Sequence, residues 1–99
     1  MTETELQRYV LRLAADRDWW AMHVRLGKAS RPITPTSVRG WPDLTLWRPG
    51  SGLLFRELKG PDGKLKPHQA DVLASLEAAG QDVDVWTPAD MATIEHELR

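Results

Sequence analysis

The sequence contains no cysteine among its 99 residues. Disulfides, thiolate metal sites such as zinc fingers, and cysteine nucleophiles are therefore excluded. The sequence also has no apolar run of membrane-spanning length, and its first residues lack the basic and apolar regions of a signal peptide. We therefore expect a soluble, cytoplasmic protein without membrane contacts. Residues 1–99 are expected to form a single domain, because this length leaves no room for a second core.

The chain has little net charge, −1 at pH 7, but its charges are unevenly distributed. Residues 25–66 carry nine basic and three acidic side chains, whereas residues 67–99 carry one basic and seven acidic side chains. A net charge of +6 in the central segment favours a polyanionic partner such as nucleic acid. The alternative is that these side chains are ordinary solvated loop charges.

Hydrophobic periodicity and turn residues predict an α/β fold of the order αβββαβα, a mixed sheet flanked by helices. The first helix, at 2–17, has apolar residues at positions 6, 9, 10 and 13 and a capping box formed by Thr2 and Glu5. Strands at 43–47 and 53–59 are predicted to form an antiparallel hairpin. The other predicted elements are a strand at 19–26, a loop at 27–40, a helix at 67–79, a strand at 83–86 and a final helix from 87.

Two short motifs lie in the predicted hairpin: Gly40 to Asp43 (GWPD) and Glu57 to Lys59 (ELK). Thirteen residues separate the two acids. Alternation along a strand puts Glu57 and Lys59 on one face and Leu58 on the other, toward the core, with its backbone carbonyl available as a further ligand. Mg²⁺ prefers oxygen ligands and usually takes one or two carboxylates. The two motifs therefore predict a divalent-metal site that activates a water for phosphodiester hydrolysis.

The role of Lys59 stays open among three: orienting the attacking water, accepting its proton, or holding the phosphate. Taken singly, both motifs have plainer explanations. Glu57 and Lys59 would form a solvated strand face, and residues 40–43 would form a turn. Their joint placement on neighbouring strands within the basic segment favours the metal-dependent nuclease.

Together with Gln69 in the following helix, the two motifs resemble the PD-(D/E)xK nuclease superfamily, and more narrowly the stand-alone form of the VRR-NUC family (virus-type replication-repair nuclease). The resemblance runs from the opening helix, where an acid precedes Leu6 and Gln7, to Val85. It implies a restriction-endonuclease-like core and one VRR-NUC-like domain. It also implies Mg²⁺- or Mn²⁺-dependent cleavage of branched DNA, such as Holliday junctions or flaps, in replication, recombination or repair, often by a homodimer.

The resemblance assigns roles in the site: Asp43 and Glu57 as metal ligands, Lys59 as the catalytic lysine, and Gln69 at the edge, supporting Lys59 or a phosphate. Glu3 is expected to be an outer acid that reaches the metal through water or helps to place the substrate. Glu5 competes with Glu3 for this role, although its place in the capping box already accounts for it.

Several basic residues are candidate contacts to DNA phosphates: Lys28, Arg31, Arg39, Lys64 and Lys66, with His68 as a weaker addition. For each lysine and arginine, ordinary loop charge is the alternative. Four of the five tryptophans, Trp19, Trp20, Trp47 and Trp86, most simply fill the core or an interface, although an exposed ring would be able to stack on an unpaired base. The apolar first helix and the Trp19–Trp20 region are the candidate dimer surfaces.

The leading hypothesis is a metal-dependent endodeoxyribonuclease of bacterial or phage origin. The second is a non-catalytic module that recognises branched DNA with a nuclease fold; the intact Asp43, Glu57 and Lys59 count against it. The third is a domain without a nucleic-acid partner, supported only by the small net charge and the acidic last third. Metal-dependent cleavage separates the first from the second, and absent or salt-insensitive DNA affinity favours the third.

Overall fold

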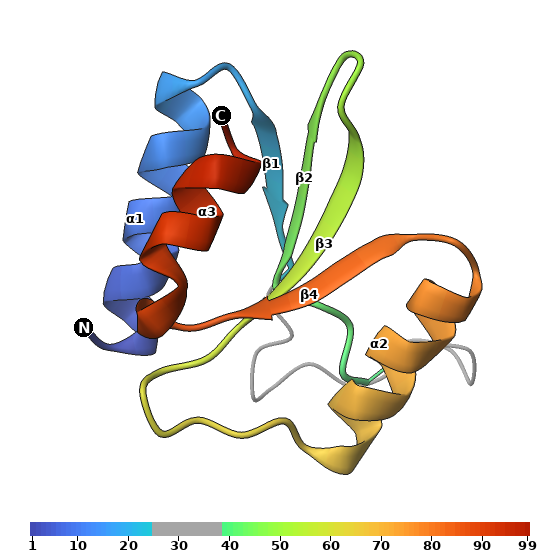
Figure 1. Cartoon of the computed structure of the whole chain (residues 1–99). Helices are drawn as coiled ribbons and strands as arrows, with labels where there is room; N and C mark the ends of the chain where they lie inside the picture. Colours follow the sequence, from blue (N-terminus) through green and yellow to red (C-terminus); the bar gives the residue numbers. More distant parts are fainter. Residues whose placement is uncertain (25–38) are drawn as a thin grey trace.

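The computed structural model describes residues 1–24 and 39–99 (Figure 1). Its elements are α1 (Glu3–Asp16), β1 (Trp20–His23), β2 (Leu44–Arg48), β3 (Gly52–Leu58), α2 (Pro67–Ala78), β4 (Asp82–Trp86), the 3₁₀ turn η1 (Pro88–Asp90) and α3 (Met91–Glu97). The predicted order αβββαβα is therefore confirmed. β1 ends at His23, and most of the predicted loop at 27–40 lies outside the described residues. None of the described helices is long and apolar enough to cross a membrane.

α1 begins at the predicted capping box. The Thr2 hydroxyl accepts a hydrogen bond from the backbone N–H of Glu5 (3.1 Å), and the Glu5 carboxylate accepts one from the backbone N–H of Thr2 (2.9 Å). The apolar stripe of the helix, Leu6, Val10 and Ala14, is fully buried. This stripe packs in the core of its own chain, so the expectation that it forms a dimer surface is wrong.

The four strands in the described part of the chain form one sheet in the order β1-β2-β3-β4, antiparallel except for the parallel pair β3 and β4, which α2 connects. Alternation along β4 sends its side chains to different helices. Trp86 is buried in the core cluster with residues of α1 and α3, whereas Val83 and Val85 line a shallow cavity with Leu73 and Ala74 of α2. α1 and α3 therefore cover one face of the sheet, and α2 lies on the other, beside β4 (Figure 1).

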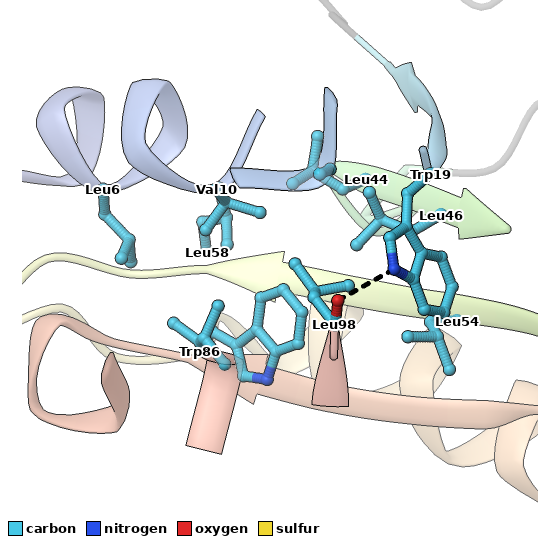
Figure 2. Packing of buried hydrophobic residues seen from close by; sticks show 11 residues of the cluster. Leu6, Val10, Trp19, Leu44, Leu46, Leu54, Leu58, Trp86 and Leu98 are labelled. Atoms are coloured by element: carbon cyan, nitrogen blue, oxygen red, sulfur yellow. Dashed lines mark hydrogen bonds between the residues drawn. The ribbon is translucent and has the colours of Figure 1, made fainter. Parts of the chain in front are cut away.

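The hydrophobic core lies between the sheet and the helix pair α1 and α3 (Figure 2). Its buried members come from the sheet, from α1 and α3, and from residues next to these elements: Leu6, Val10, Ala14, Trp19, Leu44, Leu46, Leu54, Leu58, Trp86, Ile94 and Leu98. Burial of each large apolar side chain stabilises the fold by about 1.5–3 kcal/mol. The buried indole N–H of Trp19 donates to the backbone carbonyl of Leu98 (3.0 Å), which connects the end of α1 to the last turn of the chain.

Two arginines of the basic central segment make contacts within the fold and do not contribute to a cationic surface. Arg56 is 1% exposed, and its Nη2 donates to the carboxylates of Asp82 (2.9 Å) and Glu97 (3.3 Å). Arg48 lies 4.6 Å from the ring centroid of Trp19 and donates to two backbone carbonyls. The net charge of +6 therefore overstates the charge that this segment offers to a polyanion.

Candidate active site

The β2–β3 hairpin brings the two predicted acids to opposite positions on adjacent strands. Its register pairs Leu44 with Arg56, so one step further along places Asp43 opposite Glu57. Residues opposite each other in an antiparallel pair have Cβ atoms about 4.5–5.5 Å apart, and like charges placed this way are destabilising. A pair of acids at this position costs stability, which is typical of a functional site.

The backbone of each motif is bonded to the carboxylate of the other. An oxygen of Asp43, Oδ2, accepts the backbone N–H of Leu58 (2.9 Å), and Oε1 of Glu57 accepts the backbone N–H of Asp43 (3.3 Å). These two bonds continue the hairpin past its last backbone pair and fix both carboxylates. The motifs alone did not predict this reciprocal bonding, because it depends on the register of the hairpin.

Lys59 and Gln69 complete the constellation around Glu57. The Lys59 ammonium lies 3.2 Å from Oε2 of Glu57 and donates to Oε1 of Gln69 (3.0 Å). The Gln69 side-chain amide in turn donates to Oε2 of Glu57 (3.1 Å). Oε1 of Gln69 also accepts the backbone N–H of Lys66 (2.9 Å), at the start of α2. The structure thus brings the four central predicted residues, Asp43, Glu57, Lys59 and Gln69, into one hydrogen-bonded group.

Glu57 is 2% exposed, and this burial dominates its titration. Burial, together with the nearby charge of Asp43, raises the pKa of Glu57 to about 7, although Lys59 acts to lower it. A carboxyl group that is half protonated near neutral pH is rare outside functional sites. Leu58, between Glu57 and Lys59, is 1% exposed and belongs to the core cluster, as strand alternation predicted.

The donor set fits a hard divalent cation that keeps most of its water. Within 1–24 and 39–99, no three His, Cys, Asp or Glu side chains come together in a way that would hold a metal. The two opposed carboxylates of Asp43 and Glu57 match the one or two carboxylates that Mg²⁺ usually takes. An additional positive charge would also relieve the repulsion between these two opposed carboxylates, of which that of Glu57 is buried. The residues present therefore suit Mg²⁺ or Mn²⁺ rather than a fully protein-ligated ion.

The first-helix acids lie on exposed positions at the start of α1. Glu3 packs beside Gly60, the residue after Lys59: a Cβ on Gly60 would lie 3.5 Å from the Glu3 backbone nitrogen. Glu5 makes the capping bonds, and the hydrogen bond from the Thr2 backbone lowers the pKa of its carboxyl group. The outer-acid role of Glu3 stays a prediction, and the structure places Glu3 next to the residue that follows Lys59.

The candidate DNA contacts are distributed around the site. Lys64 and Lys66 are exposed in the segment between β3 and α2, and Arg39 is exposed just before the GWPD motif. His68 is half-buried in the first turn of α2, against Gly40. Lys28 and Arg31 lie outside the described residues.

Comparison with known proteins gives one consistent answer. The family model described as the VRR-NUC domain matches residues 34–89. A solved structure described as a VRR_NUC domain aligns with a TM-score of 0.71, covering 97% of this chain and 94% of that chain at 19% identity. At this identity the likeness shows the shared fold. A search of curated proteins found no match.

The raised pKa of Glu57 predicts a loss of stability on going from acid to neutral pH. The unfolded chain releases this proton near pH 4.5 and the folded chain near pH 7. Between these values the folded state holds up to one proton more, so the free energy of unfolding falls by roughly 1 kcal/mol per pH unit and then levels off. Urea unfolding from pH 4.5 to 8 in EDTA measures this slope.

Glu57→Gln is the matched variant, because it retains the shape and removes the titration. The difference in unfolding free energy between wild type and Glu57→Gln should change across pH 4.5–7 and be constant above it. A difference that does not depend on pH would show that Glu57 titrates normally.

Proposed function

This chain belongs to the VRR-NUC family, and on that premise we propose that it is a metal-dependent endodeoxyribonuclease acting on branched DNA. The observation that supports the proposal best is the group formed by Asp43, Glu57 and Lys59: two opposed acids, one of them buried, with an ammonium 3.2 Å from the buried one. A protein that only binds DNA would place cations on its surface and would have no use for this costly pair of acids.

In the proposed reaction, the oxygen of a water forms a bond to the phosphorus of a phosphodiester in the bound strand, and the bond from phosphorus to the 3′ oxygen breaks. The products are a 5′-phosphate and a 3′-hydroxyl group, which takes up a proton. Asp43 and Glu57 would hold Mg²⁺ or Mn²⁺, with the Leu58 carbonyl as a further ligand. The ion, when bound, supplies positive charge for the phosphoryl oxygens and lowers the pKa of a water. Lys59, fixed between Glu57 and Gln69, is positioned to orient the water or to stabilise charge on the phosphate.

Basic side chains beside the site supply the proposed DNA contacts. Residues 60–63 fold back over Lys59, because Gly63 lies close to its stem: a Cβ on Gly63 would be 3.1 Å from the Lys59 Cβ. The exposed Lys64 therefore follows a segment packed on the site, and Lys66 bonds to Gln69 through its backbone. Their exposure beside the site supports the proposal that these two lysines contact the phosphates of a strand entering it.

Cleavage of labelled DNA by wild type and by Lys59→Ala tests the proposal. The substrates are a four-way junction, a flap, a duplex and a single strand, each with Mg²⁺, Mn²⁺ or EDTA. Wild type should cut a branched substrate only with metal. Lys59→Ala should cut about 10²–10³ times more slowly, the usual cost of removing one group that stabilises charge in the transition state.

The double variant Lys64→Ala, Lys66→Ala is the control for loss of positive charge beside the site, because it separates DNA affinity from the rate of cleavage. It should cut bound DNA at the wild-type rate but bind more weakly, and the slope of its salt dependence should fall by about 0.9 for each phosphate that it no longer neutralises. Wild type that binds these DNAs but cuts none with either metal would contradict the proposed activity. It would favour a non-catalytic DNA-binding module.

We also propose that the protein acts as a homodimer, paired through the sheet face that α2 leaves uncovered. Trp20 and Met22 of β1 are 64% and 58% exposed, and Leu53 of β3 is 46% exposed. Register aligns Trp20, Trp47 and Leu53 across three strands, and the two indole rings stack with centroids 6.4 Å apart. Exposed Trp and Met on one face are typical of protein interfaces.

A two-fold dimer would present two sites to a symmetric junction. Sedimentation velocity at micromolar concentration should give a dimer for wild type and a monomer for Trp20→Glu, Met22→Glu. Ser51→Glu, an exposed substitution at the hairpin tip, should stay dimeric. A monomeric wild type, or a dimer that survives the double substitution, would contradict this interface.

A further inference from the structure

Gly40 makes a close contact that no residue with a side chain would allow. A Cβ at this position would lie 2.8 Å from the carbonyl oxygen of His68, 2.9 Å from its Cδ2, and 3.0 Å from the Cα of Gln69. Two of these three atoms are backbone, so they have little freedom to move aside. Gly40 also has a φ of +85°, in the left-handed region that favours glycine.

This contact joins the two segments that build the site. Gly40 precedes Asp43 by three residues, and its neighbours across the contact, His68 and Gln69, form the first turn of α2. The Gln69 side chain reaches Glu57 (3.1 Å) and the Lys59 ammonium (3.0 Å) from that turn. A shift of the turn by a few tenths of an ångström would lengthen both bonds beyond good geometry.

We propose that Gly40 is a positioning residue, whose missing side chain lets α2 approach closely enough for Gln69 to hold Glu57 and Lys59 in their reactive arrangement. The inference rests on the proposed nuclease function. It goes further because Gly40 touches neither metal nor DNA in this account and acts only through Gln69. The GWPD motif then has two separate parts: Asp43 supplies a carboxylate, and Gly40 sets the distance to α2.

The chain contains a matched control for this contact. Gly50, in the β2–β3 turn, has the same φ of +85°, yet a Cβ there would meet nothing within 4 Å. Gly40→Ala and Gly50→Ala therefore introduce the same backbone strain, but only the first introduces the clash with α2. Asn tolerates this backbone conformation better than Ala, so Gly40→Asn and Gly50→Asn repeat the comparison with less strain.

Single-turnover cleavage and NMR test the proposal together. We expect Gly40→Ala to cut about tenfold more slowly or worse, and Gly50→Ala to stay within twofold of wild type. Gln69→Ala should also be slow, and Gly40→Ala with Gln69→Ala should be no slower than the slower single variant, because both changes remove the same interaction. The side-chain NH₂ resonances of Gln69, assigned by their loss in Gln69→Ala, should shift in Gly40→Ala but not in Gly50→Ala.

Two results would overturn the positioning role. One is a cleavage rate in the Gly40→Ala, Gln69→Ala double variant that falls by the product of the two single losses. The other is Gln69 side-chain resonances that do not shift in Gly40→Ala. The positioning role would also be overturned if Gly40→Ala and Gly40→Asn both failed to fold while Gly50→Ala and Gly50→Asn both folded. The proposed effect is confined to one turn of α2 and should leave the rest of the fold intact. A wild-type protein that cuts no DNA would defeat the nuclease proposal. The NMR comparison would still decide whether Gly40 sets the place of Gln69.

Discussion

The opposition of Asp43 and Glu57 across the end of one hairpin is the constraint on which the site depends. Two acids in this position repel each other, and burial of Glu57 adds to the cost. The surrounding groups offset this cost: each carboxylate accepts a backbone N–H from the other motif, and Lys59 lies beside Glu57. The carboxylates of Asp43 and Glu57 therefore concentrate negative charge at the end of this hairpin, and a divalent cation would neutralise that charge.

The rest of the fold holds that hairpin from both sides. On one face, α1 and α3 pack against Leu44, Leu46 and Leu58, which fixes the strands that carry the acids. On the other, the first turn of α2 brings Gln69 to Glu57, and close backbone packing at Gly40 makes this approach possible. Glu57 thus lies on a strand, Gln69 on a helix, and Asp43 and Lys59 directly beside strand ends, which suits a site with demanding geometry.

Much of this arrangement was predictable from the sequence, because it follows from local periodicity. The hairpin, the shared face of Glu57 and Lys59, and the capping box at Thr2 all depend on residues close in sequence. Burial of Arg56 was not predictable, because its partners Asp82 and Glu97 lie far along the chain. The sequence places Gly40 in the GWPD motif or in a turn, but its contact with α2 is not predictable, because it appears only when the helix is in place.

The most direct test of the central claim is a Mn²⁺ titration by electron paramagnetic resonance, followed by cleavage of the same samples. Asp43→Asn keeps the shape of the site and removes one of the two carboxylates, while Asp62→Asn changes an exposed acid in the turn after β3. We predict that Asp43→Asn loses both the Mn²⁺ site and cleavage, and that Asp62→Asn retains both. Unchanged Mn²⁺ binding and cleavage in Asp43→Asn would contradict the claim that the opposed carboxylates form the catalytic centre.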